Sequence, residues 1–176
     1  MSFARALGWS IWIVALLGLA FLLLSKAVEA GTYSVPNSMS DGGKWDTYTA
    51  LVDELDERGD FVEIRVRNCT SACTVFLLAK KMCTDPETRY HFHGPSARWT
   101  WATFIAFGIP WPDDGLSDEK HAWAVNRMAD VYNSRVPGLG DWFKERAAHR
   151  FGLGVVTVRG AELNRVFLIP LCGEKP

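Results

Sequence analysis

The sequence predicts an α/β fold with a mainly parallel sheet flanked by helices. Residues 61–67 and 89–93 each alternate between apolar and polar side chains, as half-buried strands do. Apolar residues at helical spacing lie before the first stretch and after the second. Strands that alternate with helices favour parallel pairing. With 176 residues and 48% hydrophobic content, the chain has the size of one globular domain plus a short accessory segment.

The first half of the predicted domain contains a brief strand, a turn, a helix and a strand. We expect the brief strand at residues 32–35 and a turn at Asp41-Gly42-Gly43. A helix with one apolar face should follow and end at Gly59. That face is formed by Tyr48, Leu51, Val52 and Leu55. Residues 61–67 form the strand that follows, and Ser71 lies just past its end.

Residues 72–82 are apolar nearly all round, which predicts a buried helix that Pro86 ends. The strand at 89–93 directs Tyr90 and Phe92 to one side and His91 and His93 to the other.

The second half predicts two helices and two strands. The segment 99–111 is rich in aromatic residues and suits a loop or cap that lines a groove, faces a membrane or covers the core. Helices should begin near Ser117 and near Asp141. Strands are expected at 155–158 and 165–169. No second boundary is evident, so residues 31–176 are predicted to form a single domain.

The first 30 residues are predicted to be a signal anchor or a signal peptide. The run from Ala6 to Leu24 is uncharged and as a helix would extend about 28 Å, close to the thickness of a bilayer's hydrocarbon core. Arg5 precedes it, and Val28-Glu29-Ala30 offers a possible cleavage site. A buried core helix is the third alternative. Both membrane readings place the domain outside the cytoplasm.

Charge and cysteine content narrow the function classes. The 19 basic and 20 acidic side chains nearly balance, so the chain has no excess of positive charge to bind phosphate. We therefore expect no nucleic-acid partner. In an oxidising compartment Cys69, Cys73, Cys83 and Cys172 should form at least one disulfide. Sequence alone does not fix the pairing. The alternative is a zinc site made of the first three cysteines with His93.

Ser71 and His93 are the candidate catalytic residues. A serine needs a base to take its proton and donors to hold the oxyanion. Ser71 lies where a strand gives way to a helix, and His93 ends a second strand. Gly42-Gly43 could bring backbone N–H groups close to a substrate carbonyl. The alternatives are a helix cap for Ser71, a structural hydrogen bond for His93 and a substrate contact or exposed position for His91.

These motifs resemble the Clp protease proteolytic subunit (ClpP) and crotonase superfamily, in particular its exported ClpP-like branch. The resemblance rests on three stretches, in the family's order and at similar separations. They are Asp41-Gly42-Gly43, Thr70-Ser71-Ala72-Cys73 and Phe92-His93-Gly94-Pro95. Cys69, Cys73 and Cys83 also match that branch. Asp41 replaces the family's proline, and the family's first βα unit is shortened or missing.

The resemblance implies a ClpP/crotonase-like domain with a serine peptidase site. Ser71 would be the nucleophile and His93 the base, and Gly43 and Ala72 would donate the oxyanion hydrogen bonds. Asp141 is the candidate acid, with Asp130 as a fallback and His149 nearer the motif-aligned place. Without an acid to orient the imidazole, turnover would be slow or absent.

The predicted function is therefore an exported or membrane-anchored serine hydrolase that cuts polypeptides without a cofactor or metal. It would face the periplasm from a bacterial-type inner membrane, or be periplasmic or secreted if the N-terminal segment is cleaved. The resemblance also implies possible self-association. One alternative is a catalytically silent scaffold that binds a peptide or protein. A crotonase-type acyl-thioester enzyme is the other, although an exported protein would lack coenzyme A.

Overall fold

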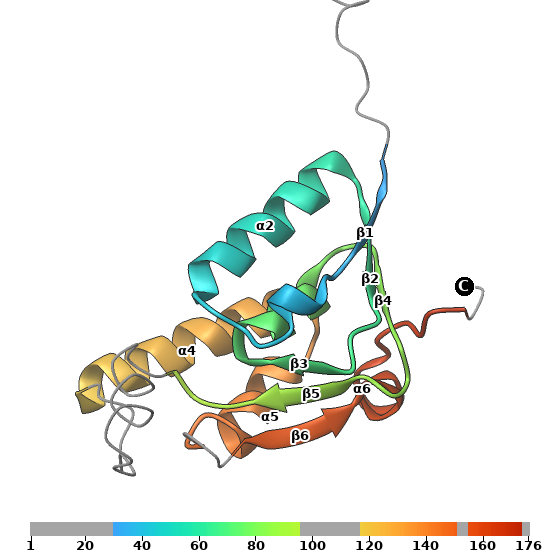
Figure 1. The fold of residues 1–176 in the computed structure, drawn as a ribbon. Coiled ribbons are helices and arrows are strands. Elements are labelled where there is room, and N and C mark those ends of the chain that lie inside the picture. Colours follow the sequence, from blue (N-terminus) through green and yellow to red (C-terminus); the bar gives the residue numbers. More distant parts are fainter. Residues whose placement is uncertain (1–29, 96–116, 151–154, 174–176) are drawn as a thin grey trace, which may run out of the picture.

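The computed structural model describes residues 30–95, 117–150 and 155–173, which form two three-stranded sheets with helices around them (Figure 1). In sheet A all pairs are parallel, in the order β1 (Thr32–Ser34), β2 (Phe61–Ile64), β4 (Met82–Thr84). Sheet B has the order β3 (Asn68–Thr70), β5 (Arg89–Phe92), β6 (Val156–Arg159). Strand β3 is parallel to β5, and β6 is antiparallel to it. The α/β class and the mainly parallel pairing are thus confirmed, but the strands are divided between two sheets.

The strand predicted for 61–67 is confirmed only as far as Ile64, because the chain then crosses to the other sheet. Strand β2 ends at Ile64, and β3 begins at Asn68 in the other sheet. Val62, Ile64 and Val66 are all buried, so the alternation continues through the crossover. The pattern therefore predicted the burial of these residues correctly and the end of the strand incorrectly.

The buried run after β3 forms a 3₁₀ helix, η2 (Ser71–Leu78), rather than a helix to Met82. Every residue from Ala72 to Leu78 is buried. The backbone becomes extended at Ala79 (ψ 138°), the chain passes exposed Lys80 and Lys81, and β4 follows. An apolar run without a period does not show where a helix ends and a strand begins, so the start of β4 was not predicted.

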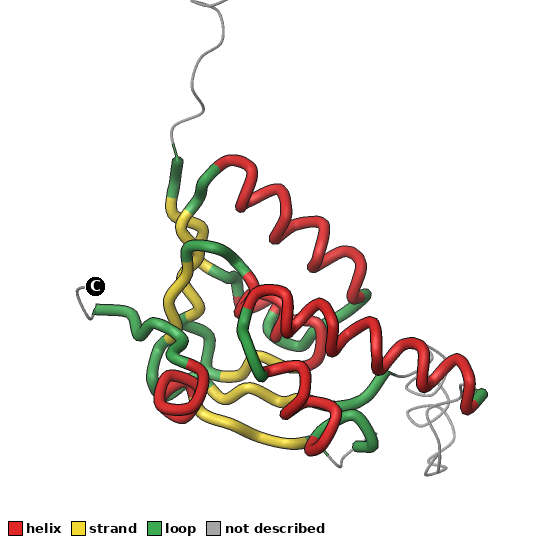
Figure 2. The backbone as a smooth tube through the Cα atoms, turned by 180° about the vertical axis from the view of Figure 1, so that it is seen from behind, coloured by secondary structure: helices red, strands yellow, loops and turns green. Residues whose placement is uncertain are grey.

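The described residues form five further helices, of which the second, third and fourth in chain order were predicted. They are η1 (Asn37–Met39), α2 (Trp45–Arg58), α4 (Asp118–Arg135), α5 (Leu139–Arg146) and α6 (Gly160–Phe167). Helix α2 ends at Gly59, whose φ of 73° is the left-handed conformation that glycine adopts readily. The helices and strands can be followed from behind in Figure 2.

The strand predicted for 165–169 is wrong, since most of it belongs to α6. Gly160 and Leu163 are buried and Phe167 is half-buried. Their spacing is helical and places them on one side of α6. Leu168 then ends the helix with a φ of 58°.

Aromatic rings join sheet B to the helices behind it. Tyr90 and Phe92 are buried, as predicted for one face of β5. The Phe92 ring centroid lies 5.9 Å from that of Tyr132 on α4 and 5.1 Å from that of Trp142 on α5. These contacts fix the inner face of β5, so His91 lies on its outer face, and His93 follows one residue after the strand ends.

The N-terminal run from Ala6 to Leu24 and the aromatic segment 99–111 lie outside the described residues. Among the helices that are described, none has the length and apolar character needed to cross a membrane.

Candidate functional site

Ser71 and His93 follow two neighbouring parallel strands at the same edge of sheet B. Strands β3 and β5 pair in register, with Thr70 opposite His91. Ser71 comes one residue after Thr70, and His93 comes two residues after His91. The carboxyl ends of adjacent parallel strands are a common place for ligand sites in α/β proteins.

Ser71 has a strained backbone. Its φ is 56°, the left-handed region that serine seldom adopts, at a cost on the order of 1 to 3 kcal/mol. Helix η2 begins at Ser71, and its N-cap position is taken by Thr70. Ser71 is therefore not the helix cap. Non-glycine residues held in this conformation cluster at functional sites.

Gly42 packs directly against the Ser71 turn. Its φ is 83°, and a Cβ on it would lie 2.7 Å from Ser71 Cβ and 2.6 Å from the Thr70 carbonyl oxygen. The Thr70 N–H also donates to the Ser40 carbonyl at 2.7 Å. The glycine turn is thus held on the end of β3, and Gly42, not Gly43, makes the close contact.

The two predicted oxyanion donors, Gly43 and Ala72, directly follow Gly42 and Ser71 in the sequence. Gly43 is exposed and follows directly after the contact at Gly42. Ala72 is in the first turn of η2, where N–H groups have no partner within the helix. In the described part of the chain, neither N–H donates to a protein acceptor. Both are thus available to an oxygen bound beside Ser71.

Two buried hydroxyls hold the Ser71 carbonyl. Thr74 Oγ1 donates to the Ser71 carbonyl oxygen at 2.6 Å, and the Tyr132 hydroxyl lies 2.6 Å from Thr74 Oγ1. Because Thr74 uses its proton on Ser71, Tyr132 must be the donor to Thr74. Helix α4 therefore supports the turn at Ser71 from within the core. Neither residue was predicted as part of the site, because threonine and tyrosine within helical segments carry no signal of such a role.

His93 has the tautomer of a general base. Its Nδ1 lies 2.7 Å from the Gly94 carbonyl oxygen, which only accepts, so Nδ1 carries the proton. Nε2 therefore keeps its lone pair. Gly94 is itself fixed, since its N–H donates to the Arg150 carbonyl at 2.9 Å. Burial lowers the pKa of His93 from its ordinary value of 6.5, and the bond to Gly94 opposes this in part.

The Ser71 hydroxyl and the His93 ring are not hydrogen-bonded to each other within the described residues. Catalytic hydrogen bonds are often long in unliganded enzymes and tighten when substrate binds.

His91 differs from His93 because both of its ring nitrogens are occupied. Nδ1 lies 2.9 Å from Thr157 Oγ1, and Nε2 lies 3.3 Å from Asn68 Oδ1. The ring thus connects β5 to both neighbouring strands. Desolvation and nearby Arg89 lower its pKa, which keeps it neutral. The geometry therefore favours His93 over His91 as the base.

Asp141 lies in the first turn of α5, is exposed, and accepts a hydrogen bond from Asn133 Nδ2 at 3.3 Å. Asp130 is exposed on α4, and the exposed His149 ring lies 6.2 Å from the His121 ring. In the regions that the structure describes, no hydrogen bond joins any of the three candidates to His93. The partner of His93 Nδ1 is instead a backbone carbonyl, which residue types do not reveal.

All four cysteines are paired in disulfides. Cys69 bonds to Cys73 across the Ser71 turn, and Cys83 on β4 bonds to Cys172 near the C-terminus. The expectation of at least one disulfide is therefore confirmed. With every thiol oxidised, the cysteines lack the thiolates that the zinc alternative requires.

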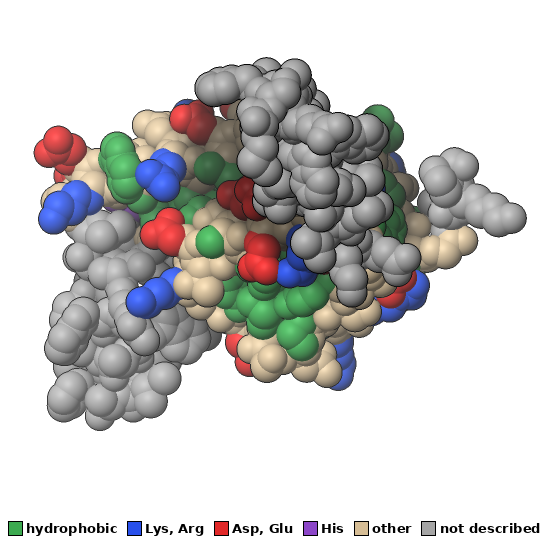
Figure 3. Space-filling view, turned by 90° about the horizontal axis from the view of Figure 1, so that it is seen from above, with side chains coloured by type: hydrophobic (Ala, Val, Ile, Leu, Met, Phe, Trp, Pro, Cys, Tyr) green, Lys and Arg blue, Asp and Glu red, His purple; other side chains and the backbone are tan. Residues whose placement is uncertain are grey.

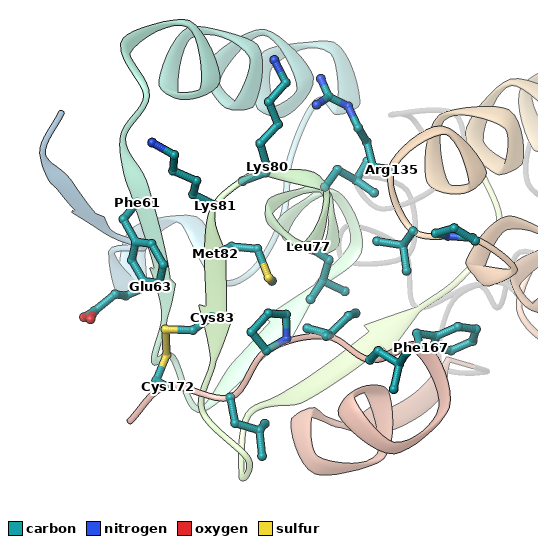
Figure 4. Close-up of a pocket in the computed structure, with 18 of the residues that line it drawn as sticks. Phe61, Glu63, Leu77, Lys80, Lys81, Met82, Cys83, Arg135, Phe167 and Cys172 are labelled. Atoms are coloured by element: carbon teal, nitrogen blue, oxygen red, sulfur yellow. A yellow bond between two sulfur atoms is a disulfide. The ribbon is translucent and has the colours of Figure 1, made fainter. Parts of the chain in front are cut away.

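A groove of about 840 Å³ lies away from this site, between β4 and the C-terminal segment (Figure 4). Leu77, Met82 and Phe167 contribute apolar surface, and Lys80 and Lys81 lie at one side. Phe61 and Leu168 also line it, with 38% and 83% of their surface exposed. Neither Ser71 nor His93 is part of the lining. On the face seen from above in Figure 3, acidic and basic side chains are interspersed.

No family model matches the chain, and no curated protein matches it. Among solved structures, the chain is similar to ClpP1 from Listeria monocytogenes, with 11% identity and a TM-score of 0.44. The match covers 89% of this chain and 97% of that one. At this level the similarity carries no functional conclusion, so the candidate site depends on its own geometry.

Proposed function

We propose that this protein is a serine hydrolase of the peptidase type, with Ser71 as nucleophile and His93 as general base. The observation that carries the proposal is the strained backbone of Ser71, held by Gly42 at the end of the strand next to His93. A structural serine has no need of a left-handed conformation supported from both sides.

In the proposed reaction, Ser71 Oγ attacks the substrate carbonyl carbon and its proton passes to His93 Nε2. The N–H groups of Gly43 and Ala72 stabilise the oxyanion that forms. His93 then gives the proton to the leaving amine as the C–N bond breaks. Water then attacks the ester carbonyl carbon at Ser71 and gives a proton to His93. His93 passes that proton to Ser71 Oγ as the ester bond breaks, and the acid product leaves. No cofactor or metal takes part in these steps.

The Gly94 carbonyl is proposed to orient the His93 ring, since it accepts the Nδ1 proton. A neutral carbonyl stabilises imidazolium less than a carboxylate does, so slow turnover is expected. Asp141 is the proposed third residue only if it leaves Asn133 and approaches His93 when substrate binds.

The second candidate function is a scaffold that binds a peptide or protein partner without catalysis. The apolar groove with exposed Phe61 and Leu168 favours it, because large exposed apolar side chains beside a groove are typical of partner surfaces. Attachment to, or export across, a bacterial-type inner membrane through residues 1–30, and self-association, are further parts of the proposal.

Labelling with a fluorophosphonate probe separates the two candidates, because the probe reacts only with activated serines. We expect the folded wild-type chain to label and Ser71→Ala to lose the label. Ser134→Ala is the matched control, since Ser134 is an exposed serine on α4 that bonds only the Val131 carbonyl. Equal labelling of Ser71→Ala, or no labelling of folded wild type, would leave the scaffold as the better description.

A further inference from the structure

The outer face of sheet B carries rows of polar side chains that lead to the candidate site. Strand register places Asn68, Arg89 and Arg159 side by side across the three strands. The next row contains Thr70, His91 and Thr157. His93 comes two residues after His91, just past the end of β5, and the strands can be followed in Figure 1.

The first row holds two arginines directly opposite each other. Arg89 and Arg159 are register partners in the antiparallel pair, so their side chains leave the same face. Both are exposed. Like charges opposite each other destabilise a sheet, and such a pair is best satisfied by an anion between or above the two guanidinium groups.

The protein's own anions neutralise this pair only in part. Glu87 Oε2 lies 3.4 Å from Arg159, and both side chains are more than half exposed, so the contact is weak. Arg89 forms no ion pair within the described residues. The row therefore keeps positive charge at the surface.

The second row lies between the two arginines and the catalytic candidates Ser71 and His93. His91 is fixed by Thr157 and Asn68, so the face between the arginines and His93 is neutral and ordered. At about 3.3 Å per residue, the extended chain from Arg89 to His93 spans roughly 13 Å. An extended peptide covers this distance in about four residues.

We propose that Arg89 and Arg159 form a subsite for an acidic side chain of the polypeptide substrate, about four residues from the bond that is cut. The subsite deepens the proposed function and depends on it for the position of the scissile bond. Arginine is suited to this role because its planar donors match a carboxylate in two parallel hydrogen bonds.

Binding to the full-length Ser71→Ala chain tests the subsite without requiring turnover. The probes are fluorescein-labelled peptides of alanine and serine with a single glutamate, and counterparts with glutamine in its place. We expect tighter binding of the glutamate peptides, and Arg89→Gln with Arg159→Gln should weaken it about fivefold. Salt should reduce the preference, since screening acts on exposed charges.

Arg127→Gln is the matched control, because Arg127 is an exposed cation over Trp123 on α4, on the other side of β5. Equal affinity for glutamate and glutamine peptides, or an equal loss in the control, overturns the subsite. In the wild-type chain, cleavage about four residues from the glutamate supports it, and cleavage independent of the glutamate position overturns it. Absent fluorophosphonate labelling with retained glutamate preference would reject the peptidase and keep the anion site.

Discussion

Gly42 and Ser71 are in direct contact: a Cβ on Gly42 would fall 2.7 Å from Ser71 Cβ. Both residues also have a positive φ, of 83° and 56°. The glycine turn and the serine turn therefore form one unit, in which a side chain at position 42 would displace Ser71.

Gly42→Ala tests this unit. The added methyl group meets backbone as well as Ser71, so we expect a loss of roughly 2 to 4 kcal/mol in the free energy of unfolding and little or no fluorophosphonate labelling. Gly59→Ala is the control, because Gly59 has a similar φ of 73° but its nearest neighbour would lie 3.7 Å away. It should cost about 1 kcal/mol and leave labelling intact. Full labelling of Gly42→Ala would contradict the contact's role.

The pH dependence of labelling reports on His93. Because burial lowers its pKa, His93 stays neutral, and able to accept a proton, below its ordinary value of 6.5. The labelling rate should therefore be retained as pH falls to 6.5 and be lost at a lower midpoint. His149→Asn, which changes an exposed histidine, should not move that midpoint. A midpoint above 6.5, or one that shifts in His149→Asn, would argue against His93 as the base.

Asp141→Asn separates the two ways of orienting His93. If the Gly94 carbonyl holds the ring, the substitution should change the rate of peptide hydrolysis only a few-fold, since Asp141 is exposed and contacts Asn133. If Asp141 acts as the acid of a triad, its loss should cost roughly 10⁴-fold. His93→Gln, measured in parallel, should lower the rate by at least about 10²-fold.

The two disulfides should affect stability and labelling differently. Cys69–Cys73 closes a loop with a sequence separation of 4 around Ser71, whereas Cys83–Cys172 has a separation of 89. Loop entropy gives about 2 kcal/mol for the first and about 4.6 kcal/mol for the second. Replacing Cys69 and Cys73 by alanine should thus lower the free energy of unfolding less than replacing Cys83 and Cys172 does. It should nevertheless reduce fluorophosphonate labelling more. The reverse order of effects on labelling would show that the Ser71 turn does not need its disulfide.

The sequence predicted those parts of the fold that have a clear period and a clear stop. Helix α2 has both, in its apolar face and Gly59. The change of sheet between Ile64 and Asn68 has no such signal, because Val66 remains buried within the crossover. Strand β4 was hidden because the apolar run before it lacks a period, and part of α6 was mistaken for a strand because short apolar runs suit both structures.

The candidate site was predictable where it depends on side-chain type and order. The alternation of residues 89–93 predicted the strand that His93 follows, whereas Ser71 follows β3, which begins just after the predicted stretch 61–67. The partner of His93 was not predictable, since the Gly94 carbonyl is a backbone group whose position depends on Arg150. The choice of Gly42 over Gly43 as the contact also depends on tertiary packing.

The central claim is that Ser71 is an activated nucleophile, and peptide mapping of the fluorophosphonate adduct tests it most directly. Wild-type protein is labelled, digested and analysed by mass spectrometry, with heat-unfolded protein as the control for non-specific reaction. The expected result is a single adduct on Ser71 that is absent from the unfolded protein and strongly reduced in His93→Gln. An adduct on another serine, or the same yield on Ser71 after unfolding, would contradict the claim.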